Sequence, residues 1–234
     1  TPSNSSAASD VYKRQIFTQG ETTGIFQFES DGMRRYLKLL KPDSIDDLIA
    51  MNALYRPGPM QYIDSYIARK HGREKVSYPH PDVEDVLKST YGIAIYQEQV
   101  MMLAQRLAGY SLGEADILRR AIGKKKAKIM QQQRNIFVEK AEKKKLSAKL
   151  ANKVFDIIEE FAGYGFNKAH STAYAVLAYQ TAYLKKYYPL EFIAANLTFC
   201  KSNEDIEKFF HECKLREIEI LPPDINRSHE NFIV

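Results

Sequence analysis

The stretch FAGYGFNKAHSTAYAVLAYQ, residues 161–180, contains the end of one predicted helix and the start of another. The first ends at Gly163, and the second continues as a long apolar run. Four polar or cationic residues crowd together before that run, namely Asn167, Lys168, His170 and Ser171. One capping residue is enough to start a helix, so this excess calls for a second explanation.

Helical patterns also fill the chain on both sides of this stretch. Ser111 with Glu114 forms a predicted capping box, and Ser147 is a predicted cap. Two short segments look like strands instead, Ile93–Tyr96 and residues 218–223. The sequence predicts a mainly α fold with many helices and one or two short strand pieces. The expected helices cover about residues 30–40, 43–55, 61–69, 81–90, 97–110, 111–123, 126–145, 147–163, 171–188, 189–199 and 203–217.

Composition indicates a soluble globular protein. The 234 residues suffice for one large domain or two small ones, and 44% of them are hydrophobic. No apolar run approaches the roughly 18 residues of a membrane span, and the start has no signal-peptide core. Two cysteines, Cys200 and Cys213, are too few for a disulfide framework. We therefore expect a cytoplasmic protein without a membrane partner.

The two ends of the chain differ from its middle. Residues 1–15 are small, polar and without periodicity, which predicts a disordered tail or a foreign scar. Residues 16–217 carry the helical domain. Residues 218–234 have the character of the beginning of a following linker or domain that is cut short.

The charge distribution is uneven. Residues 119–149 contain twelve Lys or Arg against two Glu, although the net charge of the whole chain is only +5. A segment this basic attracts a polyanion such as the phosphates of a nucleic acid. A solvated helix face would have the same composition, so both interpretations remain open.

Three groups of residues could bind phosphate. In residues 161–180, Ser171 is a predicted helix cap, while glycines, Lys168 and His170 could make the helix start an anion site. Ordinary capping with solvent-facing side chains is the alternative. Arginine forks and lysines also suit phosphate oxygens, as in LRRAIGKKKAK and LYRPGP. These two motifs supply Arg119, Arg120, Lys124, Lys125, Lys126 and Arg56, for which a structural role is the alternative.

A catalytic centre is missing from these patterns. The chain has no Asp-x-Asp pair, no Walker motif and no dinucleotide-binding glycine pattern. We therefore predict no catalytic residue and no metal ligand in this chain.

Several stretches together resemble one family, the alpha subunits of bacterial DNA polymerase III, which are C-family replicative polymerases. The resemblance covers about residues 22–232. It is carried by GIFQFESDGMRRYLKLLKP, IAMNALYRPGP, RKHGRE, YGIAIYQEQVM, LAGYSLGEADILRRAIGKKK, FAGYGFNKAHSTAYAVLAYQTAYLKKYYPLEF and LPPDIN.

The resemblance implies a helical fingers domain that receives the incoming deoxynucleoside triphosphate (dNTP). It implies that Arg119 and Arg120 contact the triphosphate, with Asn167, Lys168, His170 and Ser171 beside the same pocket and Arg56 a further contact. Lys124, Lys125 and Lys126 would contact DNA or phosphate. It also implies that the Mg²⁺ ions are held by a palm domain absent from this chain, so the chain alone should be inactive. Further implied partners are primer-template DNA, the sliding clamp, the clamp loader and the proofreading exonuclease. A non-catalytic helical module that binds nucleic acid through residues 119–149 is the alternative function.

Overall fold

The computed structural model describes residues 15–123 and 127–234, so Lys124, Lys125 and Lys126 lie outside the described residues. The chain divides into two compact units. One comprises Thr1–Ser44 with Tyr174–Val234, and the other comprises Ile45–Ala173.

The unit formed by Ile45–Ala173 begins with short helices. A buried ion pair joins the helix Ile45–Leu54 to the helix Ile63–Lys70, because the Lys70 Nζ lies 2.7 Å from the Asp47 Oδ2. Residues 81–90 form three short pieces instead of the single helix expected there. The elements are α3 (Ile45–Leu54), η1 (Pro59–Tyr62), α4 (Ile63–Lys70), η2 (Pro81–Val83), α5 (Glu84–Leu87) and η3 (Lys88–Thr90).

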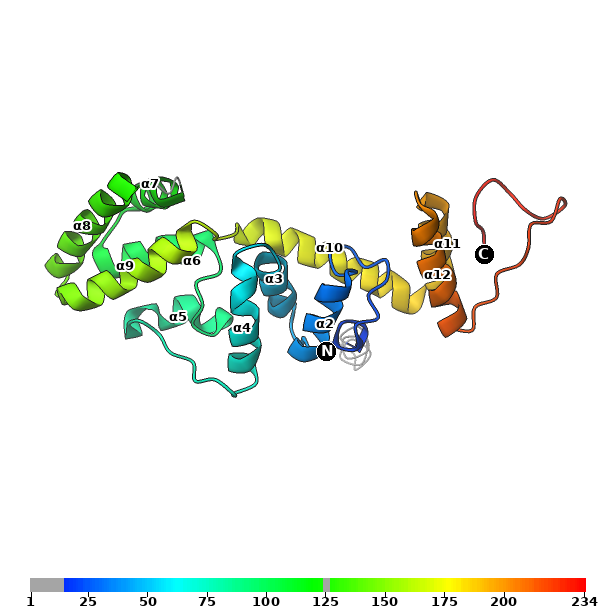
Figure 1. Ribbon diagram of the computed structural model, residues 1–234, viewed down its shortest axis with the longest axis horizontal. Helices are drawn as coiled ribbons and strands as arrows, with labels where there is room; N and C mark the ends of the chain where they lie inside the picture. The colour runs from blue at the N-terminus through cyan, green and yellow to red at the C-terminus, as the bar shows by residue number, and fades with distance from the viewer. Residues whose placement is uncertain (1–14, 124–126) are drawn as a thin grey trace, which may run out of the picture. The chain divides into compact units, whose positions relative to one another are not determined.

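Four longer helices form a bundle in the same unit: α6 (Gln97–Ala108), α7 (Leu112–Gly123), α8 (Ala127–Lys143) and α9 (Ala148–Ala162) (Figure 1). Its core contains large apolar side chains that are fully buried, and Phe137 packs against Phe155 with ring centroids 5.6 Å apart. The predicted caps are confirmed. The Ser111 Oγ accepts from the Glu114 N–H while the Glu114 carboxylate accepts from the Ser111 N–H, and the Ser147 Oγ accepts from the Leu150 N–H.

The other unit contains α2 (Asp31–Leu40), α11 (Pro189–Phe199), α12 (Asn203–Leu215) and most of α10 (Lys168–Tyr187). Residues 15–19 are helical as well. The apolar face of α2 is buried, and Ser30 caps this helix. A fully buried lysine, Lys185 of α10, forms an ion pair with Glu212 of α12.

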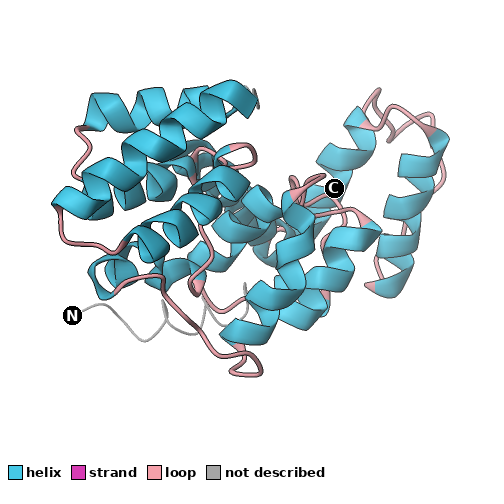
Figure 2. Cartoon of the chain, turned by 60° about the vertical axis from the view of Figure 1, so that its left-hand side comes forward, coloured by secondary structure: helices cyan, strands magenta, loops and turns pink. Residues whose placement is uncertain are grey.

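The mainly α fold is confirmed, but the strand pieces are wrong. Helices and loops make up the described chain, as Figure 2 shows, and no strand occurs in residues 15–123 or 127–234. Segment Ile93–Tyr96 contributes a single parallel bridge, from Tyr96 to Phe166. Residues 218–223 form no β-bridge with any described residue. A strand needs a partner along its length, and neither segment has one. No described helix has both the length and the apolar character that crossing a membrane takes.

Candidate functional site

The start of α10 is capped by Asn167, not by Ser171. The Asn167 Oδ1 accepts from the His170 N–H at 2.8 Å, and α10 begins at Lys168. Ser171 lies one turn into the helix with no exposed surface, and its hydroxyl donates to the Ile49 carbonyl at 2.6 Å. The prediction of Ser171 as the cap is therefore wrong. The expectation that the four polar residues lie at or just before a helix start is confirmed for Asn167 and Lys168, whereas His170 and Ser171 lie within the first turn, because the helix begins three residues before the expected start at residue 171.

A carboxylate that the sequence did not single out holds this helix start. Glu98, in the first turn of α6, accepts from the Asn167 Nδ2 at 3.1 Å. Both of its oxygens also accept from the Lys168 N–H, each at 3.1 Å. The first turn of a helix favours negative charge, and here a side chain of the protein supplies it. The signal in the sequence was the acidic residue within YQEQ, but nothing local connects it to residue 168.

The beginnings of α6 and α10 are joined through the backbone. The Gln97 N–H donates to the Phe166 carbonyl at 3.0 Å, and the Phe166 N–H donates to the Ile95 carbonyl at 3.1 Å. The Lys168 Nζ lies 5.4 Å from the centroid of the Tyr96 ring. The negative face of this aromatic ring attracts the ammonium group. Burial raises the pKa of Tyr96. The first residues of α6 therefore contact both the backbone and the side chain of Lys168.

Arg56 packs against the turn that precedes α10. Its Nη2 donates to the Tyr164 carbonyl at 2.8 Å, its Nε donates to the Ala53 carbonyl at 3.1 Å, and its guanidinium lies 4.2 Å from the centroid of the Phe166 ring. Burial lowers the pKa of Arg56. These contacts give Arg56 a structural part in holding residues 164–166, and its contact with a nucleotide stays a prediction.

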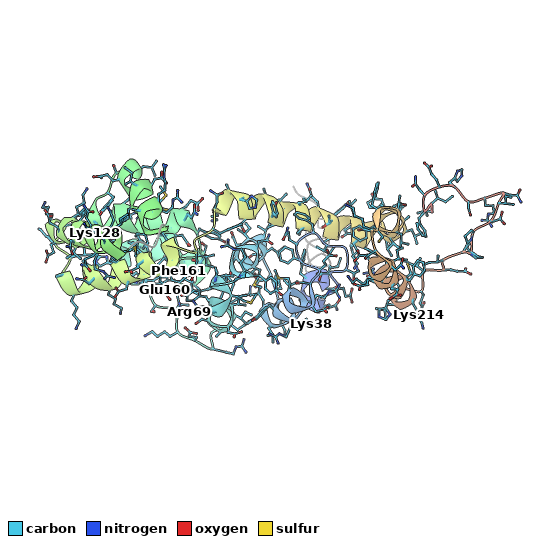
Figure 3. All side chains as sticks on the ribbon, turned by 45° about the horizontal axis from the view of Figure 1, so that its top comes forward. Lys38, Arg69, Lys128, Glu160, Phe161 and Lys214 are labelled. Carbon is cyan, nitrogen blue, oxygen red and sulfur yellow. The ribbon has the colours of Figure 1, made fainter. Side chains whose placement is uncertain are left out.

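Neither glycine of this turn has a left-handed backbone angle. Gly163 has a φ of −78° and closes α9. A Cβ on Gly165 would lie 3.1 Å from the Phe161 carbonyl oxygen and 3.3 Å from Gln97, so a side chain there would force these neighbours to shift. At the end of α9, Glu160 and Phe161 (labelled in Figure 3) both contact Tyr62.

The arginine pair of α7 is held by one acid. Asp116 accepts from the Arg119 Nε and Nη2 at 3.1 and 2.8 Å, and from the Nε of Arg120 at 2.8 Å as well as from its Nη2. Hydrogen bonds from Arg120 and Arg119 lower the pKa of Asp116. The side chain of Arg119 is 24% exposed and that of Arg120 is 67% exposed. Within the described residues no bond uses either Nη1 group, so the pair retains donors for a further anion.

The basic segment 119–149 is partly neutralised by acids, most of which lie outside it. Among the described cations of this segment, ion pairs are formed by the two α7 arginines and by Arg134, Lys140 and Lys143. Lys128 is exposed on α8 (Figure 3). The local excess of twelve cations over two acids therefore overstates the surface charge. The pairs are Arg134 with Asp156 and Glu159, Lys140 with Glu114, and Lys143 with Glu139.

The candidate residues thus form two groups within the Ile45–Ala173 unit. Arg56, Asn167, Lys168, His170 and Ser171 lie together at the start of α10, where His170 also contacts the edge of the Phe166 ring. Arg119 and Arg120 lie on α7 and bond to Asp116, and no described hydrogen bond or ion pair joins them to the first group. Convergence of the two groups on one ligand stays a prediction. Among residues 15–123 and 127–234 no cluster of three His, Cys, Asp or Glu could hold a metal ion.

Comparison with known sequences shows the class of protein. Residues 6–145 match the profile of the bacterial DNA polymerase III alpha subunit finger domain, and the chain belongs to that family. The chain is 52% identical over 227 residues to DNA polymerase III subunit alpha of Bacillus subtilis (strain 168), covering 97% of this chain. It is 52% identical over 227 residues to the protein of that name from Escherichia coli (strain K12), and 50% identical over 226 residues to that from Aquifex aeolicus (strain VF5). The latter two alignments cover 94% and 96% of this chain.

The chain spans about a fifth of the length of these relatives, 20%, 20% and 19% respectively.

Proposed function

We propose that this chain is the part of a replicative DNA polymerase that binds the triphosphate of the incoming dNTP. The observation that carries the proposal is the arginine pair on α7 of a finger domain. Two guanidiniums share one carboxylate, which leaves a positive charge and unused donors on adjacent side chains. Lys168, Asn167, His170 and Ser171 at the start of α10 form the second part of the proposed site, with Arg56 bracing the turn before it.

Charge supports a site that draws on both groups. A triphosphate carries several negative charges, and one helix start supplies only about half a unit of positive charge. Glu98 already offsets the charge at the start of α10. Cations from elsewhere in the chain are therefore needed, and the α7 arginines have the geometry that phosphate oxygens favour.

The remaining parts of the proposed activity lie outside this chain. Templated DNA synthesis, the Mg²⁺ ions and contacts with the sliding clamp, the clamp loader and the proofreading exonuclease would belong to other regions of the polymerase, in the cytoplasm. The chain itself would contact primer-template DNA, with Lys124, Lys125 and Lys126 the candidate phosphate contacts. A primer-extension assay on the purified chain with Mg²⁺ and all four dNTPs should show no product. Templated extension in a preparation free of host polymerase would contradict this.

Binding of dATP and deoxyadenosine to the 234-residue chain tests the proposal. The double variant Arg119→Ala/Arg120→Ala should weaken dATP binding by more than about tenfold, because each lost charge-assisted contact is worth at least about 1.5 kcal/mol. Deoxyadenosine, which has no phosphates, should be unaffected. The matched control Arg106→Ala/Lys143→Ala also removes two exposed cations that are paired with acids and should bind as wild type does.

Equal affinity of the arginine variant and the control for dATP would refute the proposal. Tight DNA binding that depends on salt but not on nucleotide would instead support the helical nucleic-acid-binding module.

A further inference from the structure

An acidic residue lies among the polar and cationic residues at the start of α10. The carboxylate of Glu98 is half-buried and makes three hydrogen bonds of 3.1 Å to Asn167 and Lys168. It comes from α6, about seventy positions earlier in the chain. Asn167 uses its two amide ends separately, the Nδ2 on Glu98 and the Oδ1 on the His170 N–H. Glu98 thereby fixes which way the Asn167 amide points.

Lys168 is held at both of its ends by residues that begin α6. Its backbone N–H donates to Glu98, and its ammonium group lies over the Tyr96 ring at 5.4 Å. The backbone bonds between Phe166 and residues 95–97 fix the spacing of the two helix starts. The direction in which Lys168 leaves α10 therefore depends on α6.

We propose that Glu98 is a positioning residue for the nucleotide site, acting through Lys168. This inference rests on the proposed function. A negative group beside a triphosphate site would reduce affinity if it faced the ligand, so a role through its hydrogen-bond partners accounts better for its place. Those bonds hold a lysine and an asparagine in one geometry, and a binding site gains affinity when its contacts are ordered before the ligand arrives.

The alternative is that Glu98 only stabilises α10. A carboxylate at a helix start contributes to stability whether or not a ligand binds. The two roles differ in what they change. A stabilising role lowers the unfolding temperature and leaves the affinity of the folded chain unchanged, whereas a positioning role changes the affinity and does so only while Lys168 is present.

Binding of dATP to the full chain, with unfolding temperature measured in parallel, distinguishes the two roles. Glu98→Ala should bind dATP about tenfold more weakly, the factor that one charge-assisted hydrogen bond is worth. Glu98→Gln retains one acceptor oxygen and the shape of the side chain, so it should fold and recover part of the affinity. Glu84→Ala is the matched control, because Glu84 is an exposed acid in the first turn of α5.

A second set of variants tests the route through Lys168. In a Lys168→Ala background, Glu98→Ala should weaken dATP binding by less than about twofold, because non-additive effects identify residues that act together. The same tenfold loss in both backgrounds would overturn the inference, as would an unchanged affinity with a lowered unfolding temperature.

The arginine variant separates this inference from the proposed function. Binding that requires Arg119 and Arg120 but is insensitive to Glu98→Ala would overturn the inference alone. A wild-type chain that binds no dATP would overturn both.

Discussion

The buried ion pair between Lys185 and Glu212 predicts a loss of stability whose size depends on which partner is removed. The Lys185 Nζ lies 2.8 Å from the Glu212 Oε1 and 2.9 Å from the Thr23 carbonyl oxygen, and its side chain is 1% exposed. Glu212 has a second cation, because the Arg216 Nε lies 2.6 Å from its Oε1. Removing either partner should therefore have unequal effects.

Glu212→Ala leaves a buried ammonium group with one described partner, a neutral carbonyl. An orphaned buried charge of this kind destabilises by about 3–5 kcal/mol. Neutralising a lysine at pH 7, from its ordinary pKa near 10.5, costs about 5 kcal/mol, which sets an upper limit on the loss. Burial already lowers the pKa of Lys185 even with its carboxylate partner present. We expect a loss near 4 kcal/mol.

Lys185→Met removes the buried ammonium and leaves Glu212 bonded to Arg216. The expected loss is about 1.5–3 kcal/mol, the value of one hydrogen bond to a charged group. The double variant Lys185→Met/Glu212→Leu replaces the pair by apolar side chains and should recover to within about 1 kcal/mol of wild type. The stability losses of the two single variants should therefore not add up in the double variant.

Urea unfolding followed by far-UV circular dichroism measures these losses, because the chain is largely helical and has no tryptophan. The control is Lys208→Ala, which breaks the exposed pair of Lys208 with Asp205 on α12 and should change stability far less than Glu212→Ala does. Equal losses for Glu212→Ala and Lys185→Met, adding in the double variant, would refute the reasoning.

Two further predictions concern the same elements. Burial raises the pKa of Glu212, but the hydrogen bonds from Lys185 and Arg216 outweigh it and lower the pKa overall, so its stabilisation is present above the ordinary carboxyl value of 4.5 and lost as pH falls below it. The difference in urea midpoint between wild type and Glu212→Gln should shrink below pH 4.5, and a constant difference would contradict this. Ser171→Ala should cost about 1–2 kcal/mol by losing the buried bond to Ile49, whereas Thr172→Ala, which loses a bond within its own helix, should cost less; equal losses in thermal unfolding would contradict this.

Much of the helical structure followed from local rules, and those parts were predicted correctly. Ser111 and Ser147 each cap the helix that their patterns indicated, because a cap bonds to a residue only three positions away. The same rule gave the wrong cap for α10, because both Asn167 and Ser171 are good capping residues. The choice is made by Ile49 and Glu98, which lie far away in sequence and bind one candidate each.

The strands and the charge were misjudged for a related reason. Segment Ile93–Tyr96 has strand-forming residues, but it meets only Phe166, and no sequence pattern states which partner a segment will find. The basic stretch has acids near it in space, such as Asp156 and Glu159 on α9, that a count along residues 119–149 leaves out. The cationic residues were visible in the sequence, whereas the acids that orient them, Asp116 and Glu98, were not.

Hydrogen–deuterium exchange of the chain with and without dATP tests the central claim most directly. Nucleotide binding by two converging groups predicts slower exchange in two separate segments, residues 112–123 of α7 and residues 164–171 at the start of α10. Deoxyadenosine at the same concentration should protect neither segment. Protection of only one of the two, or of the 127–145 segment alone, would contradict a triphosphate site built from Arg119, Arg120 and Lys168.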